Sequence, residues 1–551
     1  MSKHGIEHRF GQAAGERVLL AGVVTADQPA AVTVDFSVVS IVDYSFTGSY
    51  TSPADANDFG GTLPSGSVIF APGETSKTIT VNVSGDTNIK RTEGFTVTGG
   101  YPSRFLARPL CRQWRFSMSP KVVARIVVLS LVWTAPLLAD DGLRERIKDA
   151  NGVRTDVWVY NDIGKAMEQA RKENKPIFVT FRCVPCKDCA AFDADVANGN
   201  DKVRDIAKEK FISVRQVEMK GVDLSLFQFD HDLNWAGMFI NADGVVYARY
   251  GTQSAEGSDA YNSIDGLVNT MNRVLELHAN YPKNADELKG KRGKPKPFKT
   301  ALEMPGLQNP SKFAQQTERG NCIHCHNIHD AEQLHAKQSG TFSQDLLWRY
   351  PLPDKIGLKI DRVSGIKVSE VVADSPAAKA GLKAGEEIVR MNGQRITSIA
   401  DMQWVLHNIP NTAAEMVLEG SQSGKQTLSL PAGWKKSDIS WRGSMWSLSP
   451  RLGVWAPNLA LDERDKLGIP KTDTALLVRM IIRNTPGGQN AYDAGLREGD
   501  VIVAMDGQPV RMTSQQFNAH LKLNYKPGDK LPVTVVHKDG QREEVKIPLA
   551  D

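Results

Sequence analysis

Between residues 155 and 282, the spacing of hydrophobic positions alternates between a helical and a strand period. The helical spacing predicts helices over residues 163–173, 203–210 and 264–278. Short apolar runs predict strands over residues 177–181, 238–240 and 245–250, and Asp243-Gly244 predicts a hairpin turn between the last two. This order of elements predicts an α/β sandwich.

The C-terminal part of the chain contains an internal repeat. Ala380-Gly381-Leu382-Lys383-Ala384-Gly385 recurs as Ala494-Gly495-Leu496-Arg497-Glu498-Gly499. The apolar run that follows, with its Asn392-Gly393 pair, recurs with Asp506-Gly507 at the same offset of 114 residues. A period of this length is too long for a solenoid and predicts two whole domains, over residues 354–435 and 450–550.

The composition is that of a folded, multidomain protein. The chain has 551 residues, 67 Lys+Arg against 63 Asp+Glu, a formal net charge of +4 and 41% hydrophobic residues. This length predicts several domains of about 100–200 residues each, and the hydrophobic fraction excludes general disorder. The balanced charge gives no reason to expect a nucleic-acid partner. No apolar run reaches the about 18 residues that a membrane-spanning helix needs, so a stable membrane span is not expected.

Residues 118–139 have the pattern of a secretory signal peptide. Lys121 and Arg125 form a basic start, an apolar core follows over residues 126–133, and Ala139 precedes an acidic pair. A buried strand is the alternative. A signal peptide predicts a periplasmic or secreted, cell-surface location.

Residues 1–117 precede this signal and contain alternating apolar positions broken by Pro-Gly turns over residues 58–98, which predicts β-structure. The stretch Ser67-Val68-Ile69-Phe70-Ala71-Pro72-Gly73-Glu74 resembles part of a Calx-β repeat. That resemblance implies an extracellular module; calcium is not expected, because Arg91 replaces an acidic residue. The alternative is an N-terminal extension that is not translated, with Met118 as the true start.

Cys322-Ile323-His324-Cys325-His326, within a segment spanning residues 311–350, is the strongest motif. Two thiols three residues apart on a helical turn face the same way and suit thioether bonds to haem. His326 would then bind the haem iron on the proximal side. The motif predicts covalent haem c. Zinc is the alternative, because His324, His326 and His329 lie beside the two sulfurs.

The distal side of such a haem needs a second ligand. His329 and His335 would share one short helix with His326 and cannot easily reach the opposite face. Met445 in a Trp-rich stretch is the candidate, and Met304 is another. Packing of these methionines in a core and an open coordination position remain alternatives.

A second cysteine cluster reads Cys183-Val184-Pro185-Cys186-Lys187-Asp188-Cys189 and directly follows the strand predicted over residues 177–181. If a helix begins at Cys183, its dipole would make that thiol nucleophilic, and Cys186 would resolve the mixed disulfide. A Cys186–Cys189 disulfide and a metal site with three thiolates are alternatives. The cluster and the order of elements over residues 155–282 resemble the thioredoxin fold. This resemblance implies a thiol–disulfide oxidoreductase with Cys183 and Cys186 as catalytic residues and Cys189 as a further candidate.

The two C-terminal repeats resemble the PDZ domains of secreted HtrA-like proteases through Ser375-Pro376-Ala377-Ala378 and the repeated Ala-Gly-Leu stretches. The resemblance implies a partly barrel-like fold with two helices, predicted near residues 402–407 and 515–521. It also implies binding of peptide C-termini through backbone amides of a loop. The matching residues are Gly357, Leu358, Ile360, Leu452, Gly453 and Val454. No Gly-x-Ser-Gly-Gly stretch accompanies them, so a serine protease domain is not expected.

Residues 283–310 separate the α/β domain from the Cys322 motif. Within them, residues 283–299 hold seven Lys/Arg, two acids and two prolines, which predicts an exposed linker. From Asp140 onward the chain resembles secreted, planctomycete-type proteins that join these three kinds of module. We therefore expect a secreted electron-transfer protein with one haem, a redox partner and PDZ modules that dock proteins. The alternatives are a non-enzymatic PDZ adaptor with structural cysteines and a sensor of degradation substrates.

Overall fold

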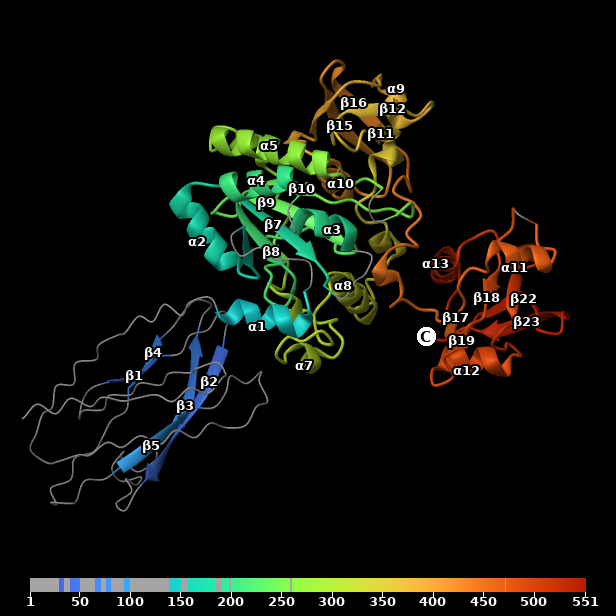
Figure 1. Ribbon diagram of the computed structural model, residues 1–551, viewed down its shortest axis with the longest axis horizontal. Coiled ribbons are helices and arrows are strands. Elements are labelled where there is room, and N and C mark those ends of the chain that lie inside the picture. Colours follow the sequence, from blue (N-terminus) through green and yellow to red (C-terminus); the bar gives the residue numbers. More distant parts are fainter. Residues whose placement is uncertain are drawn as a thin grey trace, which may run out of the picture. The chain divides into compact units, whose positions relative to one another are not determined.

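The structure is a computed structural model of the chain, and it divides into two compact units, Met1–Pro136 and Leu137–Asp551 (Figure 1). In the second unit the structure describes residues 138–149, 157–184, 190–197, 200–257, 260–470 and 472–551. In the first unit it describes five strands only.

The strands of the first unit form two small antiparallel sheets. β1 (Pro29–Thr33) pairs with β4 (Ser76–Thr80), and β2 (Ser40–Ser49) lies between β3 (Ser65–Phe70) and β5 (Gly94–Gly99). The β-structure predicted for residues 58–98 agrees with β3, β4 and β5, whereas the Calx-β resemblance stays a prediction. The predicted signal peptide lies outside the described residues except for its last two, which begin α1 (Leu138–Ile147).

The second unit opens with a five-stranded sheet in the order β10-β9-β7-β8-β6. β6, β7 and β8 run parallel, and β9 and β10 continue the sheet antiparallel. The strands are β6 (Trp158–Tyr160), β7 (Ile177–Arg182), β8 (Ile212–Gln216), β9 (Trp235–Ile240) and β10 (Val246–Tyr250). The helices are α2 (Ile163–Glu173), α3 (Ala190–Ala197), α4 (Asp201–Lys210) and α5 (Ile264–Asn280). The predicted α/β order is confirmed.

Helix α2 shows how local sequence sets these bounds. The carboxylate of Asp162 accepts a hydrogen bond from the amide of Lys165 at 2.9 Å and caps the first turn. Asn174 ends the helix with a left-handed backbone, φ 49°. Ala166 and Ala170 on its inner face are buried against the sheet. These local signals explain why the predicted bounds of this helix agree with the structure.

The two faces of the sheet are covered differently. One face packs against α3, α4 and α5. The other packs against α2 and against residues from the segment that holds the Cys322 motif, including Ile323, Cys325, Ile328 and Ala331. The Cys322 segment is therefore part of the core of the α/β domain and not a separate module.

The segment between the sheet and the repeats is built of short helices. They are α6 (Ala285–Leu288), η2 (Ala301–Glu303), α7 (Pro310–Phe313), α8 (His326–Gln338), η3 (Gln344–Leu347) and η4 (Pro353–Ile356). The prediction of an exposed linker over residues 283–310 is wrong in part, because Leu288, Lys291 and Ala301 are buried. The basic composition of this segment predicted exposure to solvent, but Lys291 is buried in an ion pair with Asp401 of the first repeat.

The two repeats fold as matching open sheets. The first contains β11 (Leu358–Ile360), β12 (Val368–Val371), α9 (Pro376–Lys379), β13 (Ile388–Met391), β14 (Gln394–Arg395), α10 (Ile399–His407), β15 (Ala414–Gly420) and β16 (Gly424–Leu430). The second contains β17 (Val454–Trp455), α11 (Leu461–Lys466), β18 (Leu476–Leu477), β19 (Met480–Ile481), α12 (Pro486–Asp493), β20 (Val501–Met505), β21 (Gln508–Pro509), α13 (Ser514–Asn524), β22 (Lys530–Val536) and β23 (Arg542–Pro548). Among these described strands no sheet closes into a barrel, which corrects the barrel-like expectation.

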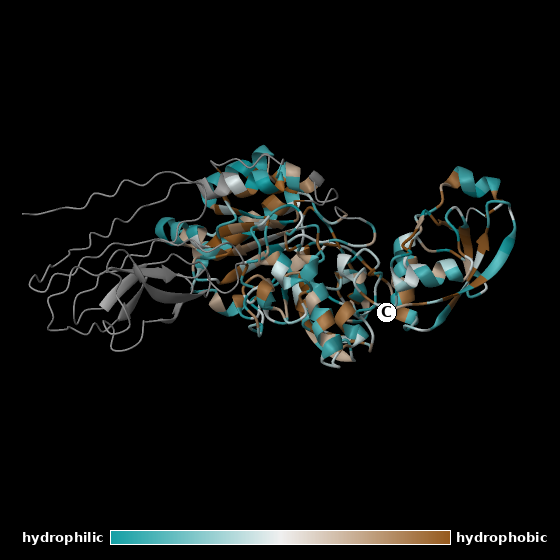
Figure 2. Cartoon of the chain, turned by 90° about the horizontal axis from the view of Figure 1, so that it is seen from below, coloured by the Kyte–Doolittle hydropathy of each residue, from teal (hydrophilic) through white to brown (hydrophobic). Residues whose placement is uncertain are grey.

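The repeat is visible in its turns. Asn392 and Gly393 have φ angles of 46° and 78°, and Asp506 and Gly507 have 50° and 72°. Two consecutive residues with positive φ form the hairpin turn that Asn-Gly and Asp-Gly favour. Figure 2 shows hydrophobic positions concentrated on the strands of the second unit. Across the described part of the chain, no helix combines the length and the apolar character needed to cross a bilayer.

Candidate functional site

Cys183 lies just beyond the end of the central strand β7. Arg182, the last residue of β7, pairs with the buried Asp193 at 2.5 Å, and Arg215 of the neighbouring β8 lies 2.9 Å from the same carboxylate. Cys183 is partly exposed and is not in a disulfide. Cys183 itself lies outside any helix, and the next helix that the structure describes, α3, begins at Ala190. Residues 185–189 lie outside the described residues, so the predicted helix start stays a prediction. Cys186 and Cys189 lie outside the described residues, and their predicted roles stay predictions.

The two cysteines of the Cys322 motif are core residues. Helix α8 begins at His326, so Cys322 and Cys325 precede it and do not share a helical turn. Cys322, 4% exposed, packs with the cluster that includes α4 and α5, and Cys325, 6% exposed, packs on the other face of the sheet beside α2. The geometric argument for two thioether bonds at one surface therefore does not hold in this structure.

The predicted haem ligands lie in different surroundings. The side chain of His326 is 40% exposed, and its Nδ1 lies 3.2 Å from the carboxylate of Asp330. Met445, in η5 (Gly443–Met445), packs in a cluster with Trp348 and Leu448, and Met304 packs beside the sheet. Both methionines are buried, at 1% and 4% exposure. The alternative of core packing describes their places, and haem binding stays a prediction.

His324, the central residue of the motif, contacts Cys183. The Sγ atom of Cys183 meets Nδ1 of His324, although the two residues are 141 positions apart. Burial, together with the neighbouring His326, lowers the pKa of His324 to about 4, so its ring is neutral at physiological pH. The two motifs are distant along the chain, and the fold brings one thiol of the first to an imidazole of the second.

Burial of the motif predicts protected thiols. Burial raises the pKa of Cys322 to about 11 and that of Cys325 to about 12, so little thiolate forms at neutral pH. We expect their alkylation by iodoacetamide in the native protein to be about a hundredfold or more slower than that of free cysteine, whose pKa is about 8.5. Mass spectrometry before and after urea measures this protection. Rapid native labelling would contradict the prediction, and absence of labelling in urea would indicate thioether bonds.

A buried charge cluster that sequence reasoning missed lies beside α8. Nδ1 of His329 is 3.0 Å from Oδ2 of Asp232. Nη1 of Arg442 lies 2.7 Å from Asp230 and 3.1 Å from Asp232. Among the residues described, Asp230, Asp232 and His329 form the group whose ligand atoms already lie close enough to hold a metal. Arg442 supplies one positive charge there, which offsets part of the negative charge of the two carboxylates.

The loop before β17 in the second repeat has the features of a carboxylate-binding loop. The predicted peptide-binding residues Leu452 and Gly453 precede β17 and Val454 begins it, and their binding role stays a prediction. The carbonyl of Gly453 accepts from the amide of Ile482 at 2.8 Å, and the carbonyl of Trp455 accepts from Arg479 at 3.0 Å. Because alternate residues of a strand point to opposite edges, the amide of Val454 points away from β19. Within the described chain, the amides of Leu452 and Gly453 donate to no backbone carbonyl.

The corresponding loop of the first repeat is used differently. Gly357 has φ 90° and donates its amide to the carbonyl of Asp354 at 2.9 Å, which closes the short helix η4. Leu358 is buried at 1% exposure and Ile360 is partly buried in the same core. The predicted residues Gly357, Leu358 and Ile360 therefore lie at the expected strand, but the glycine amide is already bonded within the chain.

Helix α10 of the first repeat docks against the α/β domain. The carboxylate of Asp401 accepts from Nζ of Lys291 at 2.6 Å and from the amide of Arg249 at 3.1 Å. The guanidinium of Arg249 lies 3.9 Å from the ring centroid of Trp404. The hydroxyl of Thr252 donates to Gln403 at 2.9 Å. Residues of β10 and the loop after it thus pack directly against α10.

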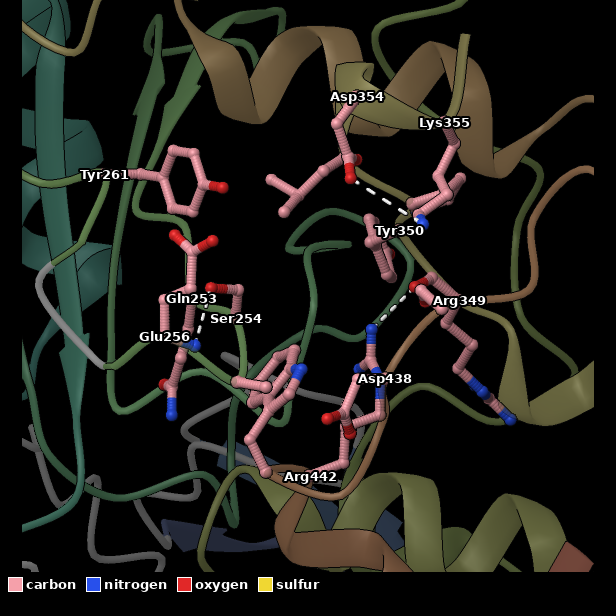
Figure 3. Close-up of a pocket in the computed structure, with 15 residues that line it drawn as sticks. Gln253, Ser254, Glu256, Tyr261, Arg349, Tyr350, Asp354, Lys355, Asp438 and Arg442 are labelled. Carbon is pink, nitrogen blue, oxygen red and sulfur yellow. Dashed lines mark hydrogen bonds and ion pairs between the residues drawn. The ribbon is translucent and has the colours of Figure 1, made fainter. Parts of the chain in front are cut away.

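A pocket of ≈ 180 Å³ lies next to this interface (Figure 3). It is bounded by the loop after β10, the segment before β11 and the stretch after β16, through residues that include Glu256, Tyr261, Tyr350, Lys355, Asp438 and Arg442. Its three basic side chains are engaged: Lys355 is 3.6 Å from Asp354, Arg349 pairs with Glu332, and Arg442 bonds Asp230 and the carbonyl of Arg349. These pairings leave the pocket without a free basic group that would indicate an anionic ligand.

Family models match three parts of the chain. Residues 158–242 match a thioredoxin-like family, and residues 349–412 and 463–549 match two PDZ domain families. A probable periplasmic serine endoprotease, DegP-like, of Marinomonas sp. (strain MWYL1) is 27% identical over 34% of this chain and 37% of the relative. A protein of the same description from Pseudomonas savastanoi pv. phaseolicola is 32% identical over 30% of this chain and 33% of the relative.

Two solved structures are also similar. A variant of the HtrA-type protease AlgW with a decapeptide is 23% identical, covers 24% of this chain and 37% of its own, and has a TM-score of 0.17. The HtrA3 PDZ domain bound to a phage-derived ligand is 17% identical, covers 18% of this chain and 86% of its own, and has a TM-score of 0.15. The chain spans about a third of the length of the DegP-like relatives, between 33% and 37% for the two above.

These comparisons correct the functional hypothesis drawn from the sequence. The expectation of a haem electron-transfer protein is wrong, because the matching relatives are DegP-like periplasmic endoproteases and the matched families are thioredoxin-like and PDZ. The haem segment and the planctomycete-type origin stay predictions. The second unit of the chain therefore contains one thioredoxin-like domain followed by two PDZ domains.

Proposed function

We propose that this protein is an extracytoplasmic adaptor whose second PDZ domain binds the C-termini of other proteins. The expected periplasmic or secreted location agrees with the names of the relatives, which are periplasmic. In this proposal the thioredoxin-like domain and the first PDZ domain form the scaffold, and the cysteines of the Cys322 motif are structural. Their burial in the two core clusters supports that role.

The observation that carries this proposal is the difference between the two loops. In the second PDZ domain the amides of Leu452 and Gly453 have no backbone acceptor within the described chain, and β17 is paired on one edge only, with β19. A peptide that adds as a strand to the other edge would bond Val454 and place its terminal carboxylate at these amides. In the first PDZ domain the amide of Gly357 already donates a hydrogen bond to the carbonyl of Asp354, and α10 is packed against the thioredoxin-like domain.

Peptide binding tests the proposal directly. We expect a labelled hexapeptide with a free apolar C-terminal residue to bind in fluorescence anisotropy, and the same peptide with an amidated C-terminus to bind at least about tenfold more weakly, because a charge-assisted hydrogen bond is lost. Equal affinity of the two peptides would contradict the proposal.

A pair of variants assigns the site. Val454→Pro removes the amide that points to the free edge while the carbonyls of Gly453 and Trp455 keep their bonds to β19. We expect it to abolish binding, and Val454→Ala, which keeps the amide, to retain it. Circular dichroism shows whether both variants stay folded. Binding that survives Val454→Pro would place the site elsewhere in the chain.

A further inference from the structure

The contact between Cys183 and His324 brings together two soft ligands from motifs that the sequence keeps apart. Sγ of Cys183, after β7, meets Nδ1 of His324, in the loop before α8. Thiolate sulfur and neutral imidazole are the ligand types that Zn²⁺ prefers in proteins. Cys322 and Cys325, the sulfurs first considered for a metal, are packed in the two hydrophobic cores. Of the three cysteines that the structure describes, Cys183 is the one that is partly exposed.

A second imidazole lies beside this pair. The ring of His326 is nearly parallel to that of His324, at 21°, with 5.5 Å between the centroids. Its Nδ1 lies 3.2 Å from Oδ2 of Asp330. A carboxylate bonded to one ring nitrogen fixes the tautomer and presents the other nitrogen to a metal, an arrangement typical of metal-binding histidines.

Asp330 is itself held in place. Its Oδ1 accepts from the hydroxyl of Ser447 at 2.6 Å, and its Oδ2 accepts from the side chain of Asn327 at 3.2 Å. These two hydrogen bonds hold the Asp330 carboxylate in position, as is typical of the residues that orient a metal-binding histidine. The side chain of His326 is 40% exposed, and zinc binding requires a shift of its ring toward Cys183.

We propose that Cys183, His324 and His326 bind one Zn²⁺ ion, with Asp330 orienting His326. Binding displaces the thiol proton of Cys183 to solvent and forms a sulfur–zinc bond, with no change of oxidation state. The site would tie the end of β7 to the start of α8. It is independent of peptide binding by the second PDZ domain, so either proposal can fail alone.

Metal titration of the full-length protein tests this site. We expect about one Zn²⁺ per chain after dialysis, measured by elemental analysis, as a single site of this kind requires. Co²⁺ in place of Zn²⁺ should produce a near-ultraviolet charge-transfer band that requires a thiolate ligand. Cys183→Ser should abolish the band, and His324→Ala or His326→Ala should weaken metal binding markedly. Asp330→Ala should weaken it about 10–100-fold.

Two matched variants serve as controls. His335→Ala removes an exposed imidazole from the same helix α8, and Cys325→Ser removes a buried thiol of the same motif; neither should change the metal content or the band. A band that persists in Cys183→Ser, or metal content that no variant changes, would overturn the proposal. If Cys183→Ser does not fold, His326→Gln tests the same site, because its side chain is partly exposed. We expect this variant to bind zinc more weakly than the wild type, and an unchanged affinity would contradict the proposal.

Discussion

Replacement of Asp401 by alanine should lower the free energy of unfolding of the thioredoxin-like domain and the first PDZ domain by about 3–5 kcal/mol, the range for breaking one side of a buried ion pair. Asp401 is 2% exposed and its partner Lys291 is 1% exposed, with 2.6 Å between Nζ and Oδ2. Burial already lowers the pKa of Lys291, and Asp401 opposes that shift. Without the carboxylate, Lys291 would be left as an uncompensated buried cation or lose its proton.

The loss should be cooperative across the interface. Asp401 also accepts from the amides of Arg249 and Thr397, so the variant weakens the contact of α10 with strand β10. Urea unfolding followed by tryptophan fluorescence measures the change, because Trp404 lies in this interface. We expect a lower transition midpoint and earlier exposure of Trp404.

Two comparisons isolate the ion pair. The double variant Lys291→Met with Asp401→Leu should recover only the part of the loss that comes from the unpaired Lys291 ammonium, because the amides of Arg249 and Thr397 still lack their acceptor. Glu370→Ala breaks the exposed pair with Lys359, whose side chains are 54% and 56% exposed, and should cost about 1 kcal/mol or less. A loss for Asp401→Ala as small as that of Glu370→Ala would show that the interface does not depend on this charge.

Local patterns predicted the elements of this protein well. The bounds of α2 agree with the predicted 163–173 because its cap and its apolar face are encoded within the helix itself. The two repeats were found from glycines and turn pairs, and the matched PDZ families start at residues with the same offset. Helices α10 and α13 contain the predicted stretches 402–407 and 515–521.

Long-range packing decided what the sequence could not show. The spacing of Cys322 and Cys325 suggested one helical face, but the helix begins at His326 and the two side chains diverge into separate cores. Lys291 belongs to a basic stretch, yet its partner lies 110 residues further along the chain. The contact of Cys183 with His324 spans 141 residues. Each of these arrangements depends on tertiary neighbours, which no local pattern encodes.

The Asp230-His231-Asp232 run did carry a signal. Two acids and a histidine lie between the apolar residues Phe229 and Leu233. Charged residues in an apolar stretch need partners when they are buried. That partner is Arg442, which is 3% exposed and comes from the stretch between the PDZ domains.

Replacement of Arg442 by methionine should therefore be the other strongly destabilising change, with an expected loss of about 3–5 kcal/mol at neutral pH, as for other broken buried pairs. Arg442 contacts Asp230 at 2.7 Å and Asp232 at 3.1 Å, and both carboxylates would lose their cation. Its second amino group also donates to the carbonyl of Arg349, so the variant loosens the segment before the first PDZ domain.

The pH dependence of this loss distinguishes charge from packing. Burial alone would raise the pKa of Asp232, but His329 and Arg442 together lower it far below its ordinary value. A carboxyl with a lowered pKa in the folded state stabilises the protein above its unfolded pKa of about 3.9 and loses that contribution as the pH falls further. In Arg442→Met this lowering is weakened, so the difference from the wild type should be largest at neutral pH and shrink below about pH 4.

Urea unfolding of wild type and Arg442→Met at neutral pH and at about pH 3.5, below the unfolded pKa of aspartate, measures this difference. Arg511→Met is the matched control, because Arg511 is 69% exposed and its pair with Asp473 should contribute about 1 kcal/mol or less. A difference that stays constant from neutral to acid pH would mean that Arg442 stabilises the protein through the packing of its side chain. A difference that narrows as the carboxylates take up protons would identify the guanidinium charge as the group that holds the Asp230–Asp232–His329 cluster together.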